Sequence, residues 1–73
     1  MGKLRVLSAK EVCQILSEHG FREVRRRGSH IIMQLNIPRS TITIPVPDHQ
    51  KIKVDTLLSI IRQSQLPRSD FEA

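Results

Sequence analysis

The chain has 73 residues, with 12 Lys and Arg against 7 Asp and Glu, so its formal net charge is +5. This length holds one domain, residues 1–73, and excludes a large enzyme with an enclosed substrate cavity. The longest apolar run is residues 31–33 and the one cysteine is Cys13, so we expect no membrane span, no secretory signal and no disulfide framework, and hence a cytoplasmic protein.

The first predicted helix begins after Ser8. Ser8 and Glu11 have the S-x-x-E spacing of a capping box, in which each residue satisfies a free backbone N–H group of the other. Gly20 is the expected left-handed residue that ends the helix. Between them an apolar face recurs at helical spacing, through Val12, Ile15, Leu16 and His19.

Residues 21–27 and 30–37 are predicted as two strands joined by Gly28 and Ser29. A two-residue connection with glycine at its first central position favours a type II′ hairpin turn. The second strand alternates, so that one face carries Ile31, Met33, Leu35 and Ile37.

Residues 38–40 are predicted to turn the chain into a third strand, residues 41–46. Pro45 cannot donate a ladder hydrogen bond, which places this strand at an edge of the sheet. A loop over residues 47–53 then leads to a second helix, with Asp55 as the expected N-cap. The apolar stripe of that helix is formed by Leu57, Leu58 and Ile61, with Ile60 beside it; Pro67 stops it, and Phe71 is expected to dock on the core.

The α-β-β-β-α order predicts a small two-layer α+β sandwich with a three-stranded antiparallel sheet. Both helices are expected on one face of the sheet, while the other face stays open to water. The covered face is predicted to carry Val24, Ile31, Met33, Leu35, Ile42 and Ile44.

The hairpin register predicts which side chains reach the open face. If residues 28–29 form the whole turn, Arg27 lies opposite His30, and directly opposed residues share a face. Arg25, Arg27 and His30 then lie together on the open face, Val24 pairs with Met33 in the core, and Arg26 must extend outward at the sheet end.

An imidazole beside two guanidinium groups suits phosphodiester cleavage in RNA. Histidine titrates near neutral pH and can act as a general acid or base, and arginines stabilise charge that develops on phosphorus oxygens. Backbone N–H groups of Gly28 and Ser29 can also receive a phosphate oxygen. Eight of the twelve basic residues are arginine, which favours nucleic acid. The alternative is an ordinary surface histidine beside solvated charges.

The remaining titratable groups are secondary. His49, Lys51 and Lys53 are second-tier candidates for RNA contact, and His49 is also a candidate second acid or base. We interpret His19 as structural and Cys13 as a partly buried small hydrophobe. The three histidines lack metal-ligand spacing, so no metal site is expected.

The sequence resembles the HicA (YcfA-like) toxin family. Gly20-Phe21, Arg25 and Gly28-Ser29-His30 are similar to its G-[FW]-x₃-R-x-x-G-S-H signature. Residues 44–49 resemble the family's I-P-x-P-x-H segment, residues 56–63 resemble its last helix, and residues 69–71 resemble its closing S-x-x-[ED]-F. Departures are Ile31 after the histidine, Asp55 before Thr56, and Ser64-Gln65 where the family usually has Ala-Gly.

The resemblance implies a fold similar to the double-stranded RNA-binding domain and an mRNA interferase, the endoribonuclease toxin of a type II toxin–antitoxin pair. It implies that His30 is required for cleavage, that no metal or other cofactor takes part, and that a HicB antitoxin masks the active face. The expected partners are therefore RNA, free or on the ribosome, and a HicB-like protein.

Two other functions fit the same residues. One is a non-catalytic double-stranded RNA-binding module, which would read shape through 2′-OH and phosphate contacts. The other is a small adaptor whose basic face binds an acidic protein. The basic cluster next to His30 favours the nuclease, as does the presence of only two aromatic residues, both expected in the core.

Overall fold

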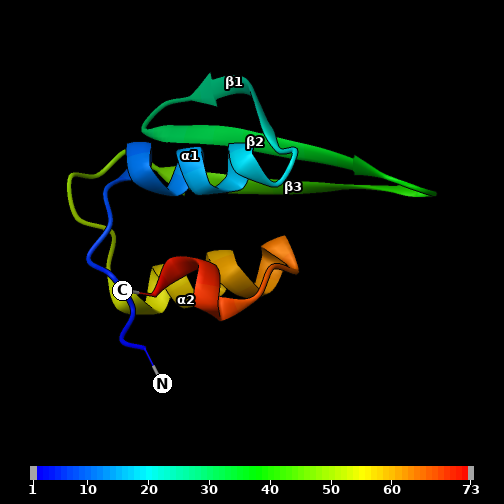
Figure 1. Cartoon of the computed structure of the whole chain (residues 1–73). Coiled ribbons are helices and arrows are strands. Elements are labelled where there is room, and N and C mark those ends of the chain that lie inside the picture. Colours follow the sequence, from blue (N-terminus) through cyan, green and yellow to red (C-terminus); the bar gives the residue numbers. More distant parts are fainter. Residues whose placement is uncertain (1, 73) are drawn as a thin grey trace.

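The computed structural model describes residues 2–72 and contains two layers. Its elements are α1 (Ala9–Glu18), β1 (Arg22–Arg27), β2 (His30–Ile37), β3 (Ser40–Pro47), α2 (Val54–Ser64) and the short 3₁₀ helix η1 (Arg68–Phe71). The strands form an antiparallel sheet in the order β1-β2-β3, with both helices on one side of it (Figure 1). The predicted α+β order is confirmed. In the described part of the chain, no helix has the length and apolarity needed to cross a membrane.

Helix α1 begins and ends where its sequence predicts. The Ser8 N–H donates to Glu11 Oε1 at 2.9 Å, and the Glu11 N–H donates to Ser8 Oγ at 3.2 Å, which completes the capping box. Hydrogen bonds from Ser8 favour the ionised carboxylate and lower the pKa of Glu11. Gly20 follows the helix with φ of +94°, a backbone conformation that glycine adopts without steric cost.

The two hairpin turns differ in how they obtain a positive φ. Gly28 has φ of +56°, while Ser29 is not in the left-handed region, as a type II′ turn requires. In the turn between β2 and β3, Pro38 is followed by Arg39 with φ of +70°.

The β2–β3 hairpin extends well beyond the helices, at the end of the sheet away from the β1–β2 turn (Figure 1). Because β3 pairs with β2 alone, the prediction that Pro45 marks an edge strand is confirmed.

The predicted pairing of Val24 with Met33 is wrong, because β1 contains a bulge. Glu23 pairs with Met33, Arg25 pairs with Ile32, and Val24 lies in the register shift between them. Val24 is consequently 36% exposed rather than part of the core. An unbroken ladder would turn Arg22 inward; the bulge turns it outward and leaves its neighbour Phe21 buried.

Helix α2 differs from its prediction at its first turn and on its apolar face. Its N-cap is Lys53, not Asp55, and the Asp55 carboxylate accepts from the Thr56 N–H at 2.9 Å inside the first turn. Leu58 is 38% exposed. The buried face instead follows the i, i+3, i+4, i+7 spacing of a helix, through Leu57, Ile60, Ile61 and Ser64.

The C-terminal segment closes the core from the side opposite the sheet. Phe71 is fully buried, as predicted. Its carbonyl accepts from the Arg5 N–H at 2.9 Å, and Leu4 bridges Glu72. The N-terminal segment and η1 are thereby held together below α1 (Figure 1).

A glycine substitution after α2 should stabilise the protein. Gln65 is the C-cap of α2 and has φ of +62°, which costs a residue with a Cβ about 1 kcal/mol. We expect Gln65→Gly to raise the free energy of unfolding by roughly 0.5–1 kcal/mol, measured by urea denaturation. Gln63→Gly, inside the same helix, is the matched control and should lower stability by about 1 kcal/mol. Equal losses of unfolding free energy in the two variants would contradict the backbone strain assigned to Gln65.

Candidate functional site

Cross-strand pairing arranges the open face of the sheet into rows. Each row takes one residue from β1, one from β2 and one from β3, and directly paired residues point to the same side. The first row is Arg27, His30 and Pro47; the second is Arg25, Ile32 and Pro45; the third is Arg22, Gln34 and Thr43. Arginines thus occupy the β1 edge of this face, and β3 contributes prolines and a threonine.

A hollow of about 490 Å³ lies on this face, lined by Arg25, Arg27, His30, Ile32, Thr43 and Pro45. The predicted gathering of Arg25, Arg27 and His30 on one face is therefore confirmed. Ile32 is only 7% exposed although it lies on the face without helices. Its neighbours across the strands, Arg25 and Pro45, flank it on both sides.

The arginines of β1 divide into paired and unpaired groups. Arg26 points to the other side, where its guanidinium lies 3.2 Å from an Asp48 carboxylate oxygen and 3.7 Å from one of Glu23. Within residues 2–72, Arg22, Arg25 and Arg27 form no ion pair, and all three are exposed. Their positive charge is therefore available to an anionic ligand.

The turn beside His30 is tied to the segment that follows β3. The Asp48 N–H donates to the Ser29 carbonyl at 2.7 Å, while the Asp48 side chain holds Arg26. Gly28 supplies the positive φ, and a Cβ built on it would meet no heavy atom within 4 Å. The glycine is needed here for its backbone conformation rather than for space.

The other RNA-contact candidates lie apart from this hollow. The His49 carbonyl accepts from the Ala9 N–H at 2.9 Å, and His49 lines a separate hollow of about 350 Å³ with Ser8, Lys10, Asp48 and Gln50. The structure does not bring His49 into the hollow of His30. Lys51 and Lys53 are exposed on the segment between β3 and α2, and neither lines the His30 hollow.

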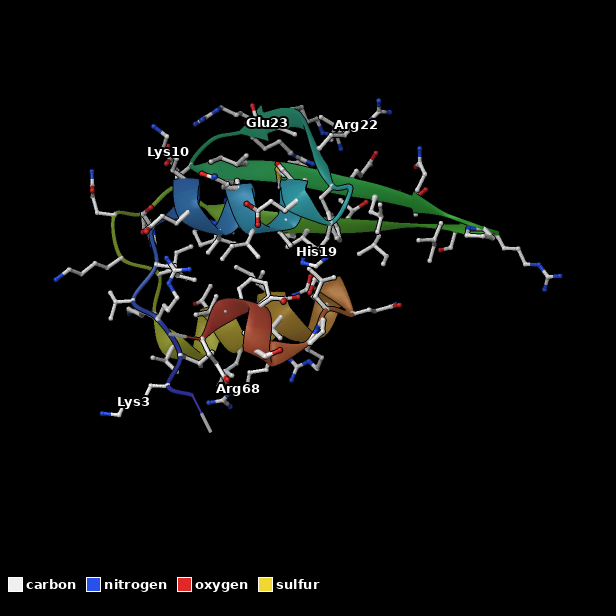
Figure 2. All side chains as sticks on the ribbon, in the orientation of Figure 1. Lys3, Lys10, His19, Arg22, Glu23 and Arg68 are labelled. Carbon is white, nitrogen blue, oxygen red and sulfur yellow. The ribbon has the colours of Figure 1, made fainter. Side chains whose placement is uncertain are left out.

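His19 and Cys13 have structural environments. His19 Nε2 lies 3.0 Å from an Asp70 carboxylate oxygen, so it joins the end of α1 to η1 (Figure 2). Burial, followed by the negative charge of Glu23, raises the pKa of the Cys13 thiol and keeps it protonated, which opposes a nucleophilic role. Over residues 2–72, no cluster of three potential ligands that could hold a metal ion is found.

Sequence reasoning did not single out several contributors to this face, among them Arg22, Ile32, Thr43 and Pro45. The burial of Phe21 is the signal that would have identified Arg22, because successive strand residues point to opposite faces. Figure 2 shows Arg22 on β1, on the side of the molecule away from Arg68 and Lys3. Thr43 and Pro45 follow from the β2–β3 register once the turn at residues 38–39 is placed.

The fold and this face together define a small α+β protein with an exposed, unpaired set of arginines beside a histidine. A family model described as the HicA toxin of bacterial toxin–antitoxin systems matches residues 9–66. The chain belongs to this HicA toxin family, so it is a toxin of a toxin–antitoxin system, for which an antitoxin is the expected partner. Comparison with curated proteins gave no match, and neither did comparison with solved structures.

The turn conformation gives a stability prediction. We expect Gly28→Ala to lower the free energy of unfolding by about 1–2 kcal/mol, because φ of +56° is unfavourable for an L-residue. Ser29→Ala is the control: Ser29 is exposed and outside the left-handed region, so its change should stay within about 0.5 kcal/mol. Urea denaturation of both variants measures the difference in the free energy of unfolding. An unchanged free energy of unfolding for Gly28→Ala would contradict the positive φ assigned to this turn.

Proposed function

We propose that the protein is an endoribonuclease, an mRNA interferase that acts in the cytoplasm, with His30 as its general acid or base. One observation carries this proposal. His30 lies in a solvent-open hollow beside two arginines of the neighbouring strand, Arg25 and Arg27, which form no ion pair within residues 2–72. A phosphodiester can enter such a hollow and find a proton-transfer group and two counter-charges together.

The proposed reaction uses the substrate's own 2′-hydroxyl as nucleophile. Its oxygen forms a bond to the adjacent phosphorus as its proton leaves, and the bond from phosphorus to the 5′-oxygen breaks as that oxygen gains a proton. The products are a 2′,3′-cyclic phosphate and a free 5′-hydroxyl. His30 performs one of the two proton transfers, and water or a group supplied by the RNA or the ribosome performs the other. No metal or organic cofactor enters this scheme.

The arginines bind the phosphate and stabilise its developing charge. Arg27 pairs with His30 across the strands and Arg25 lies in the next row, so both guanidiniums reach the hollow that contains the imidazole. Gly28 and Ser29 hold the turn and offer backbone N–H groups to a phosphate oxygen. Lys51 and Lys53 extend the positive surface from the loop that follows β3, and they contact more distant phosphates together with His49.

The proposed protein partner is a HicB-like antitoxin. An antitoxin that places carboxylates over Arg22, Arg25 and Arg27 would neutralise the charge that RNA needs and would cover the His30 hollow at the same time. This mode of inhibition is competitive with RNA, since both ligands use the same unpaired guanidiniums.

Replacement of His30 tests the proposal. We expect induced wild-type protein to arrest growth with loss of mRNA, and His30→Ala to do neither, because a general acid or base contributes at least about 100-fold to the rate. His19→Gln is the control, since His19 is paired with Asp70; it should retain activity. Circular dichroism should show His30→Ala folded, because position 30 is exposed.

Two outcomes would contradict the proposed endoribonuclease activity. If wild type and His30→Ala arrest growth equally while mRNA stays intact, the protein acts by binding. If neither arrests growth although both are folded and well expressed, the proposed nuclease activity is absent. Binding of purified protein to double-stranded and single-stranded RNA then separates an RNA-binding module from an adaptor for an acidic protein.

Salt dependence tests the arginine contacts. Each phosphate contact to single-stranded RNA contributes about 0.7 to the slope of log K against log salt. We expect Arg25→Ala and Arg27→Ala each to lower that slope by about this amount, measured by fluorescence anisotropy. Arg68→Ala is the matched control because Arg68 is paired with Glu72 at 2.9 Å on the far side of the molecule (Figure 2). Unchanged slopes would remove Arg25 and Arg27 from the contact surface.

A further inference from the structure

The hollow contains more than the proposed catalysis uses. Besides His30 and two arginines, it is lined by Ile32, Pro45 and Thr43. Ile32 and Pro45 are paired across the strands in the second row. Pro45 is exposed and Ile32 is 7% exposed, so Pro45 supplies most of this aliphatic surface, where a purely phosphate-binding site needs only charge.

Polar groups border this apolar surface on the side away from His30. In the third row the Gln34 amide Nε2 donates to Thr43 Oγ1 at 3.3 Å. That contact leaves the amide oxygen of Gln34 and the hydroxyl proton of Thr43 for a ligand. Thr43 is exposed and lines the hollow, whereas Gln34 is half-buried and borders it through its hydrogen bond to Thr43.

A nucleobase has the complementary chemistry, with two flat apolar faces and an edge of donors and acceptors. Successive rows lie about 6–7 Å apart along a strand, close to the offset that one ribose places between a phosphate and its base. A phosphate at Arg27 and His30 therefore brings its base over Ile32 and Pro45, with the base edge toward Thr43 and Gln34. The volume of about 490 Å³ is within the range of small-ligand sites.

The chain offers no Phe, Tyr or Trp ring as a platform for this base. Its two phenylalanines, Phe21 and Phe71, are 3% and 0% exposed, and His30 lies in the first row with the phosphate. Base contact in the second row therefore uses aliphatic side chains and the plane of Arg25, which is paired with Ile32. Arginine planes are known partners for unstacked bases.

We propose that Ile32, Pro45, Thr43 and Gln34 form a subsite for one unpaired nucleobase next to the scissile phosphate, and that Thr43 and Gln34 determine which base is accepted. This inference rests on the proposed endoribonuclease function. A base within a duplex is stacked on both faces and its edge is paired, so it cannot enter the hollow. The subsite therefore selects unpaired RNA at the point of cleavage.

Mapping of cleavage sites tests the specificity. New 5′-hydroxyl ends are sequenced in RNA from cells that express wild type, Thr43→Val or Thr41→Val. Thr41 lies on the same strand and face, one row beyond the hollow and bonded to Asn36, so Thr41→Val is the matched control. We expect Thr43→Val to shift the base frequencies beside the cut by about threefold to tenfold, the value of one hydrogen bond. Thr41→Val should match wild type.

A binding measurement tests the apolar contact without cleavage. In the His30→Ala protein, a six-nucleotide RNA is compared with the same RNA carrying one abasic residue and with the RNA annealed to its complement. We expect the intact single strand to bind best. We further expect Pro45→Ala to weaken binding of the intact strand but not of the abasic strand. The substitution and the abasic residue both remove the contact between Pro45 and the base, so the second change has no further effect on it.

The two proposals fail differently. If wild type produces new RNA ends and Thr43→Val gives the same base frequencies, the subsite is wrong while the nuclease stands. Equal effects of Pro45→Ala on intact and abasic RNA, or tighter binding of the duplex, would also overturn the subsite. If wild type produces no new RNA ends, the endoribonuclease and its subsite are both wrong.

Discussion

The register of the β1–β2 hairpin decides which side chains of this small protein reach solvent. A slip of one residue would turn His30 toward the helices and bring its apolar neighbours outward. The register is held at one end by the turn at Gly28, whose neighbour Ser29 accepts a hydrogen bond from Asp48. It is held at the other end by the bulge at Val24 and the buried ring of Phe21. The positions of His30 and the β1 arginines on the open face depend on these two points.

Strand alternation places the three consecutive arginines of β1 on different sides of the sheet. Arg26 points to the helix side and is neutralised by Glu23 and Asp48, while Arg25 and Arg27 on the open face form no ion pair in the described residues 2–72. Exposed ion pairs contribute about 1 kcal/mol or less, so the arrangement does little for stability. Its effect is to leave the unpaired arginines of β1 on one face of the sheet. In a fold that gains little from its charges, such a one-sided distribution favours the recognition of an anion.

The fold could be predicted because its signals are local. The capping box at Ser8, the glycine turn and the alternation of β2 each depend on residues close in sequence. The errors occurred where tertiary packing decides. No glycine next to Val24 indicates a bulge in the sequence. The bulge follows from the need to bury Phe21 and expose Arg22. Asp55 resembles an N-cap, but the N-cap of α2 is two residues earlier, at Lys53, whose carbonyl accepts from the Leu57 N–H.

The site shows the same division between local and tertiary signals. The gathering of Arg25, Arg27 and His30 follows from a two-residue turn and a period of two, so it was predictable. The position of His49 was not, because its backbone carbonyl is used at the start of α1 and that contact joins segments 40 residues apart. The third strand supplies the apolar and hydroxyl groups of the hollow only after both hairpins are in register. For that reason the charge that we propose binds RNA can be read from one segment of sequence, whereas the surface proposed to choose among bases requires all three strands.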